Sequence, residues 1–390
     1  MCIRDRPKVV RFAKPTPNHD DISKAVSLVS SAKFPVILSG AGVVLSNAIP
    51  ECVELAERLD APVCSGYQHN DSFPGSHPLA AGPLGYNGSK AAMNLISKAD
   101  VVLALGTRLN PFSTLPCYGI DYWPKSAKVI QVDINPDRLG LSKKITLGIS
   151  ADAKTTVKEI LDRLEPNAGN NDRQARKKTI AETKSKWLQE LSSMDNEEDD
   201  PGTTWNIDAR TREPERMSPR MAWRAIQSAL PQNAIISSDI GNNCAIGNAY
   251  PTFEKGRKYL APGLFGPCGY GFPSILGAKI GCPDTPVIGF AGDGAFGISM
   301  NEMSSCAREE WPAITMVIFR NYQWGAEKRN SILWFDDNFV GTELDPELSY
   351  AKVADACGLK GVTVKTMEET TNAIKQSCDD QKKGITTFIE

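Results

Sequence analysis

The chain has 390 residues, which is enough for two or three domains of ordinary size. It carries 44 Lys and Arg residues against 46 Asp and Glu residues, so its formal net charge is −2. A nucleic-acid groove or a polybasic membrane surface needs a clear basic excess, which this composition lacks. The longest apolar runs, 101–105 and 313–319, are as long as strands and fall well short of the roughly 18 residues of a membrane span. We therefore predict a globular protein without a nucleic-acid or membrane partner.

The ten cysteines and three histidines restrict the kinds of site that the sequence can form. No two cysteines are spaced as C-x-x-C, and scattered single cysteines favour a reducing compartment over a disulfide scaffold. The histidines are His19, His69 and His77, so a Ser-His-Asp triad or a His-rich metal site is excluded from the residues that follow. His69 and His77 are predicted to be surface or hydrogen-bonded structural residues. No apolar signal-peptide segment follows Met1, and we predict a cytoplasmic location.

Both ends of the sequence resemble truncations. Residues 1–19 form a lead-in, and within it residues 1–6 resemble a translated adapter scar rather than the segment that follows. Residues 384–390 have the pattern of a β-strand that stops without a turn. We therefore expect a fragment at both ends, with a short native terminal strand as the alternative for the second.

Residues 20–165 show the alternation of strands and helices that is typical of a doubly wound parallel sheet. Compact apolar runs predict the strands, and amphipathic segments between them predict the helices. The strands are predicted at 34–40, 61–66, 101–109 and 127–137, and the helices at 48–60 and 90–100. The turn Gly40-Ala41-Gly42 could bring the backbone close to a phosphate, but a tight strand-to-helix turn is the preferred interpretation.

A charged linker is predicted at 166–217, carrying a solvated helix that ends near Leu191 and an acidic run. Residues 218–390 then form a second α/β unit, beginning with a helix whose N-cap is Ser218 and whose first residue is Pro219. Further strands are predicted at 233–241, 286–294 and 313–321, and further helices at 269–281 and 297–311. The fold class is therefore α/β, with two domains that each contain a doubly wound parallel sheet.

The most specific chemical signal is Gly292-Asp293-Gly294, between an apolar strand and an amphipathic helix. In open α/β sheets, ligands bind beyond the carboxyl ends of the strands, which is where Asp293 should lie. Asn321 closes the next predicted strand, and the spacing leaves room for one helix and one strand, so the two side chains should end adjacent strands. A carboxylate and an amide oxygen beside a helix N-terminus suit Mg²⁺ and a diphosphate.

This pairing resembles the fingerprint of the thiamine diphosphate enzymes of the acetolactate synthase and pyruvate oxidase family. The resemblance covers nearly all of 20–390, and it implies that 20–165 is the central domain and that 218–390 is the diphosphate-binding domain. It implies Mg²⁺ ligands from the side chains of Asp293 and Asn321 and from the backbone carbonyl of Gln323. It also implies contacts to thiamine diphosphate from Ile240, Gly241, Asn242, Asn243, Gly266, Cys268, Gly292, Gly294, Ala295 and Asn321.

Two positions depart from the family pattern. Cys268 is smaller than the apolar residue that many relatives place beneath the thiazolium ring, and Arg320 replaces the first of two paired asparagines. Past the metal-binding turn, Lys328 and Arg329 are candidates for binding substrate anions, with solvated surface residues as the alternative. Glu327 is a candidate for proton transfer, with a surface ion pair as the alternative.

Three segments, 119–124, 257–273 and 321–345, are closely similar to the sulfoacetaldehyde acetyltransferase group of this family. The similarity implies conversion of sulfoacetaldehyde and phosphate into acetyl phosphate and sulfite, in the degradation of organosulfonates such as taurine. One alternative is a carboligase of the acetolactate synthase type. Another is a regulatory subunit whose central domain binds an adenine nucleotide, although the intact Asp293 and Asn321 pair argues against it.

The family resemblance also bears on assembly. It implies an active site built between subunits, so a homodimer or homotetramer is expected. It places the glutamate that activates the cofactor in a pyrimidine-binding domain that should precede residue 20. We therefore expect the isolated 390-residue chain to show no full turnover.

Overall fold

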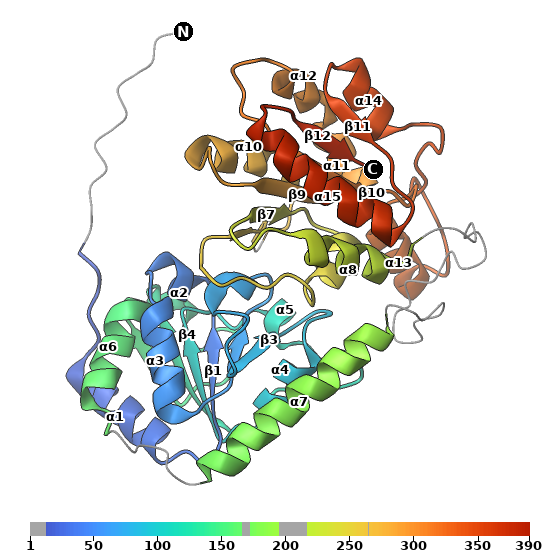
Figure 1. Ribbon diagram of the computed structural model, residues 1–390. Coiled ribbons are helices and arrows are strands. Elements are labelled where there is room, and N and C mark those ends of the chain that lie inside the picture. The colour runs from blue at the N-terminus through green and yellow to red at the C-terminus, as the bar shows by residue number, and fades with distance from the viewer. Residues whose placement is uncertain (1–12, 166–171, 195–216, 264) are drawn as a thin grey trace.

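The computed structural model describes residues 13–165, 172–194, 217–263 and 265–390. The predicted adapter scar at 1–6, most of the lead-in, and residues 166–171 and 195–216 of the predicted linker lie outside this range. The described residues form two six-stranded parallel sheets with flanking helices (Figure 1). The predicted fold class, α/β with two doubly wound parallel sheets, is confirmed.

In the first unit, residues 13–165, the parallel strands take the order β3-β2-β1-β4-β5-β6. The strands are β1 (Pro35–Ser39), β2 (Val63–Ser65), β3 (Ala80–Pro83), β4 (Val101–Leu105), β5 (Lys128–Asp133) and β6 (Leu147–Ser150). The helices are α1 (His19–Ser30), α2 (Ala41–Leu45), α3 (Ile49–Leu59), α4 (Lys90–Ile96), α5 (Pro111–Thr114) and α6 (Ala153–Arg163). Every residue of β1 and β4 is buried, as expected for central strands that are covered on both faces.

The glycine turn after β1 packs directly against the turn after β4. Gly40 N donates to the carbonyl oxygen of Leu105 at 3.0 Å, and Gly42 N donates to that of Gly106 at 2.9 Å. A Cβ atom on Gly42 would lie only 2.5 Å from Gly106 Cα. Since both N–H groups are bonded within the protein, the structure supports a tight turn at this position over a phosphate-binding turn.

The long helix α7 (Arg173–Ser193) crosses the edge of the first unit beside α4 (Figure 1). We predicted a solvated helix here, but one side of α7 is buried through Arg176, Ile180, Trp187 and Leu191. The Arg176 guanidinium donates to backbone carbonyl oxygens of Lys33, Leu59 and Asp60 at 2.8 to 3.0 Å. The charged composition of the helix misled the prediction, because a buried arginine can be satisfied by carbonyl groups.

In the second unit, residues 217–390, the parallel strands take the order β11-β12-β10-β9-β7-β8. The strands are β7 (Ile235–Ser238), β8 (Tyr259–Leu260), β9 (Val287–Gly292), β10 (Thr315–Phe319), β11 (Lys360–Val362) and β12 (Thr387–Ile389). The helices are α8 (Pro219–Ala229), α9 (Asn242–Gly247), α10 (Gly271–Gly281), α11 (Asp293–Ser299), α12 (Met303–Cys306), α13 (Gly325–Trp334), α14 (Tyr350–Ala356) and α15 (Met367–Lys382). The predicted cap of α8 is confirmed, since Ser218 Oγ accepts from Met221 N at 3.1 Å.

The structure corrects one predicted helix in this unit. Instead of a continuous helix over 297–311, α11 begins at Asp293, directly after β9, and a short 3₁₀ turn at Met300–Glu302 separates it from α12. The broken path lets Phe296, Met303 and Cys306 enter one apolar cluster against the sheet. The metal-site candidate Asp293 is therefore the first residue of a helix rather than part of a loop.

Polar contacts join the two units. The buried Asp71 of the first unit accepts, through Oδ2, from Lys258 N at 2.9 Å and from Tyr259 N at 3.2 Å, at the start of β8. Asn70 Nδ2 donates to the carbonyl oxygens of Asn248 and Pro251 at 2.9 and 2.8 Å. These bonds use backbone groups of the second unit, so they fix where its edge strand lies against the first.

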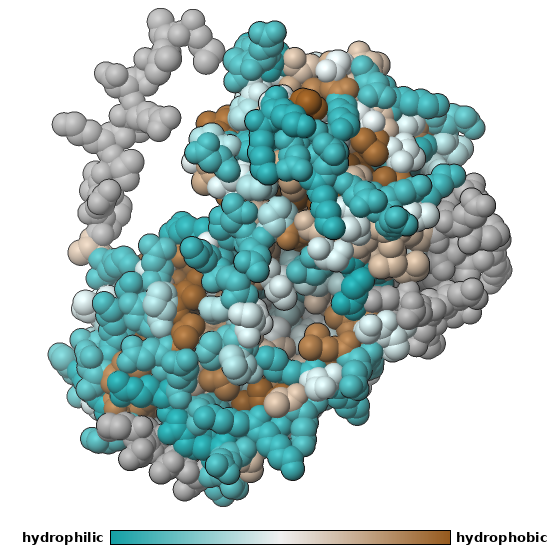
Figure 2. All heavy atoms as spheres, in the orientation of Figure 1, coloured by the Kyte–Doolittle hydropathy of each residue, from teal (hydrophilic) through white to brown (hydrophobic). Residues whose placement is uncertain are grey.

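The surface in Figure 2 is mostly hydrophilic over both units, with scattered apolar residues. No helix within the described ranges is long and apolar enough to cross a membrane. The nine cysteines of these ranges are all free thiols.

Candidate functional site

The carboxyl ends of β9 and β10 bring Asp293 and Asn321 together. The two strands pair in parallel with Phe319 opposite Gly292, so the residues that follow them lie at the same edge of the sheet. This confirms that Asp293 and Asn321 follow neighbouring strands. In the sheet order, β9 lies between β10 and β7. Open α/β sheets bind ligands beyond the carboxyl ends of such strands.

Asp293 is almost fully buried and organises the backbone around it. Its Oδ1 accepts from Gly294 N at 3.0 Å, and its Oδ2 accepts from Asn321 N at 3.1 Å and Tyr322 N at 2.7 Å. Its own carbonyl oxygen accepts from the Tyr350 hydroxyl at 3.0 Å. Burial raises the pKa of the Asp293 carboxyl to about 6, against the opposing effect of the backbone donors. A bound cation would favour its ionised form.

Three oxygen-bearing groups converge at this point. The Asn321 amide lies 2.9 Å from the carbonyl oxygen of Gln323 and 3.1 Å from Asp293 Oδ1. With its nitrogen turned toward them it donates to both, and with its oxygen turned toward them that oxygen lies beside both of the others. Since Mg²⁺ prefers oxygen ligands, these three residues fit the predicted metal-binding set. No group of three or more His, Cys, Asp or Glu residues in the described ranges could hold a metal instead.

The turn that carries these ligands is held by the segment 342–344. Tyr322 has a φ of +60°, and its carbonyl oxygen accepts from Leu344 N at 2.8 Å. Trp324 N donates to the carbonyl oxygen of Thr342 at 2.7 Å. Gly325 then begins α13, where a Cβ atom would lie 2.8 Å from Asn321 Nδ2 and 3.0 Å from Asn242 Nδ2.

A buried aspartate at the end of β7 fixes the predicted cofactor loop. Asp239 Oδ1 accepts from Ile240 N at 2.8 Å and Gly269 N at 3.1 Å, and its Oδ2 accepts from Gly271 N at 2.7 Å. The loop that leads into Gly269 contains the predicted contacts Gly266 and Cys268. Sequence reasoning did not select Asp239, whose only local signal is its place before Ile240.

The remaining cofactor candidates surround the same edge but do not all face it. Asn242 approaches Gly325, whereas Asn243 is buried and turned back toward the Asp239 carbonyl oxygen, with Nδ2 at 3.4 Å. The other candidates belong to the turns and helix starts here: Ile240 beside Gly266, Gly241 with a φ of +124°, Gly292 before α11, Gly294 beneath the Trp324 ring, and Ala295 buried in α11.

The first turns of α13 carry the polar candidates. Glu327 is exposed. Burial, and after it the negative charges of Asp239 and Glu327, raise the pKa of the Cys268 thiol. Lys328 Nζ lies 2.9 Å from Glu343 Oε1, and Arg329 Nη1 donates to the Tyr86 hydroxyl at 2.7 Å. The two cations are therefore engaged with neighbours rather than simply solvated.

Arg320, which departs from the family pattern, has a structural partner. It forms an ion pair with Glu390, donates to the carbonyl oxygen of Pro346 at 2.7 Å, and lies 4.5 Å from the centre of the Tyr322 ring. These contacts hold Arg320 in place directly before the metal-binding turn.

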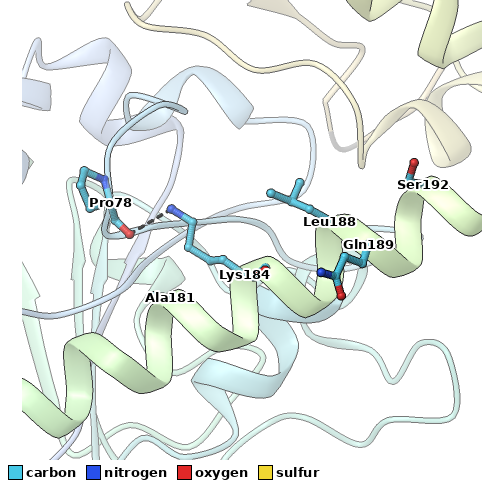
Figure 3. Close-up of a pocket in the computed structure, with 7 residues that line it drawn as sticks. Pro78, Ala181, Lys184, Leu188, Gln189 and Ser192 are labelled. Carbon is cyan, nitrogen blue, oxygen red and sulfur yellow. Dashed lines mark hydrogen bonds between the residues drawn. The ribbon is translucent and has the colours of Figure 1, made fainter.

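The other polar features serve the fold. His77 accepts from Leu79 N at 3.1 Å, as expected for a structural residue, and burial lowers the pKa of His69 to about 4. A shallow groove of about 550 Å³ lies along α7 (Figure 3). There Lys184 Nζ donates to the Pro78 carbonyl oxygen at 2.9 Å, and this hydrogen bond joins α7 to the first unit. The groove contains none of the predicted site residues.

Comparison with known proteins gives the family. The profile of the thiamine pyrophosphate enzyme central domain matches residues 22–160, and that of the C-terminal TPP-binding domain of the same enzymes matches residues 239–390. The chain belongs to the thiamine pyrophosphate enzymes. Within this family, the first unit corresponds to the central domain, and the second unit carries the Asp293 and Asn321 edge in the cofactor-binding domain.

Individual relatives of this thiamine pyrophosphate enzyme carry two kinds of name. The chain is 72% identical over 386 residues to a probable sulfoacetaldehyde acetyltransferase of Rhizobium meliloti, and the match covers 99% of the chain and 65% of that protein. It is 71% identical over 384 residues to the sulfoacetaldehyde acetyltransferase of Roseovarius nubinhibens, covering 98% and 64%. A probable acetolactate synthase large subunit of Methanococcus aeolicus is 29% identical over 381 residues, covering 97% and 62%. The chain thus spans slightly less than two thirds of these relatives.

Gly325→Ala is expected to weaken Mg²⁺-dependent thiamine diphosphate binding by about tenfold or more, because the new methyl group would displace the Asn321 amide. Isothermal titration with the cofactor measures the effect. The matched control is Gly277→Ala in α10, where a Cβ atom meets nothing within 4 Å. The control should bind the cofactor normally and be as stable as the original, since alanine suits a helix better than glycine. Equal cofactor affinity for both variants would contradict the prediction.

Proposed function

We propose that the whole protein is a thiamine diphosphate- and Mg²⁺-dependent acyltransferase that converts sulfoacetaldehyde and phosphate into acetyl phosphate and sulfite. The observation that carries the proposal is the 72% identity, over 99% of the chain, to a protein named a probable sulfoacetaldehyde acetyltransferase. The convergence of Asp293, Asn321 and Gln323 supports the cofactor part. The carboligase alternative has the support only of relatives near 29% identity.

The residues of this chain would divide the work. Asp293, Asn321 and the Gln323 carbonyl would hold Mg²⁺, and backbone N–H groups of Gly294 and Ala295 would meet the diphosphate. When bound, thiamine diphosphate supplies the carbon nucleophile that attacks the aldehyde.

Three further residues of α13 would act on the substrate. Arg329 would bind a substrate oxyanion through its planar guanidinium, and Lys328 would add positive charge nearby. Glu327 would hold or release a proton near Cys268. These roles extend the predicted site from the metal-binding turn along the helix that follows it.

Assembly and location complete the proposal. We propose a homodimer or homotetramer, supported by large apolar side chains that are exposed at and after the end of α13, such as Trp334 at 76% and Val340 at 79%. The free cysteines support the cytoplasmic location predicted from the sequence. Degradation of organosulfonates such as taurine is the proposed metabolic role.

The test is sulfite release from sulfoacetaldehyde by the whole protein, supplied with thiamine diphosphate and Mg²⁺, with and without phosphate. We expect sulfite and acetyl phosphate together, and only when phosphate is present. If the protein instead makes acetolactate-type products from 2-oxo acids and releases no sulfite, the proposal is wrong and the carboligase alternative is correct. If the whole protein shows no Mg²⁺-dependent cofactor binding, the regulatory subunit is the remaining alternative.

A further inference from the structure

A rigid turn of the first unit reaches the helix that follows the metal-binding turn. Tyr86 follows β3, and Tyr86 N donates to the carbonyl oxygen of Phe112 at 3.1 Å. Gly85 before it has a φ of +88°, and a Cβ atom there would lie only 1.9 Å from the same Phe112 oxygen. Asn248 of the second unit donates to the Tyr86 carbonyl oxygen at 3.3 Å. The backbone of Tyr86 is therefore fixed from both units.

The side chain of Tyr86 meets Arg329 on α13. Arg329 Nη1 donates to the Tyr86 hydroxyl oxygen at 2.7 Å, and the guanidinium carbon lies 5.9 Å from the ring centre. Both side chains are half-buried. Arg329 lies one helical turn beyond Gly325, on the face of α13 that abuts the amides of Asn321 and Asn242. The contact thus joins the first unit to the helix face next to the metal ligands.

We propose that Tyr86 is a positioning residue that orients Arg329 for binding a tetrahedral oxyanion of the substrates. The inference rests on the proposed function, because it assigns an anion to the same site. A guanidinium is planar, so fixing one of its terminal nitrogens sets the direction of its other N–H groups. Phosphate and sulfonate each present pairs of oxygens to which such a planar donor can bind in a bidentate way. The central domain would thereby contribute to substrate binding without touching the substrate.

The experiment compares Tyr86→Phe with the original residue in the whole protein, saturated with thiamine diphosphate and Mg²⁺. We expect the KM of one oxyanion substrate to rise about tenfold, which is the effect of losing a hydrogen bond to a charged group, with kcat and cofactor affinity unchanged. Separate titrations of phosphate and sulfoacetaldehyde show which oxyanion Arg329 binds. If neither KM changes, the proposal is wrong.

Two further variants separate positioning from general stability. In Arg329→Gln, the additional change Tyr86→Phe should have no further effect, because the hydroxyl acts through the guanidinium; additive effects would overturn the proposal. The matched control is Thr156→Val in α6, which removes a buried hydroxyl that donates to the Asp152 carbonyl oxygen at 2.9 Å within the first unit. It should lower the melting temperature without changing either KM. An equal rise in KM for this control would assign the effect to stability.

A second readout keeps this inference distinct from the proposed function. Isothermal titration with inorganic phosphate, at saturating thiamine diphosphate and Mg²⁺, needs no turnover. If the whole protein releases no sulfite but binds phosphate about tenfold more weakly in Tyr86→Phe, the acyltransferase proposal fails and the positioning role stands. If sulfite release is normal and neither KM nor phosphate affinity depends on Tyr86, the positioning role fails and the acyltransferase proposal stands.

Discussion

Asp293→Asn is expected to lower the Mg²⁺-dependent affinity for thiamine diphosphate by about 100-fold or more, since even changes beside metal ligands cost about 10–100-fold in metal affinity. The substitution removes the only carboxylate of the three converging groups, and Mg²⁺ favours charged oxygen ligands. Asparagine is the informative change, because its remaining oxygen can still accept from backbone N–H groups that alanine would leave unpaired. Isothermal titration and cofactor-dependent thermal shift measure the loss.

The control for Asp293→Asn is Asp284→Asn, which changes an exposed carboxylate of the same unit. The control should keep the thermal stabilisation that the cofactor and Mg²⁺ provide together. Full Mg²⁺-dependent stabilisation of Asp293→Asn would show that the metal binds elsewhere. A large loss of stability without cofactor would assign Asp293 to the fold instead.

Asp239→Ala is expected to lower the free energy of unfolding by about 3–5 kcal/mol even without cofactor, as when one partner of a buried charged network is removed. The reason is the set of backbone N–H groups from Ile240, Gly269 and Gly271, which would lose their acceptor. Denaturant unfolding of the chain, followed by circular dichroism, measures the change. Asp284→Ala is the exposed control and should change stability by about 0.5 kcal/mol or less.

A loss of stability in the absence of cofactor distinguishes Asp239→Ala from Asp293→Asn. Because Asp239 fixes the loop that contains Gly266 and Cys268, its loss should weaken cofactor binding as well as folding. Asp239→Asn keeps an acceptor oxygen and should recover part of the stability. If Asp239→Ala were as stable as its exposed control, the loop would be held by other contacts and the argument for Asp239 would fail.

Local sequence patterns predicted the inner strands of both sheets and the adjacency of Asp293 and Asn321, because apolar runs and turn residues set strand ends. They did not predict the four edge strands β3, β6, β8 and β11, which are short and have no long apolar run. The missed features depend on partners far along the chain. Asp239 bonds to residues 30 and 32 positions later, and Tyr86 bonds to Arg329 across 243 positions. The buried side of α7 depends in the same way on carbonyl groups more than 100 positions away. No local periodicity contains this information.

Asp71 has a consequence for how the molecule unfolds. Strand β8 has two residues and is an edge strand of the second sheet. The N–H groups of Lys258 and Tyr259 donate to the Asp71 carboxylate of the first unit. So short a strand has little stability of its own. Melting of the first unit would release this edge and leave its donors open to solvent or to another chain. The backbone amides of this edge are therefore expected to lose their protection from hydrogen exchange as soon as the first unit opens, before the rest of the second sheet does.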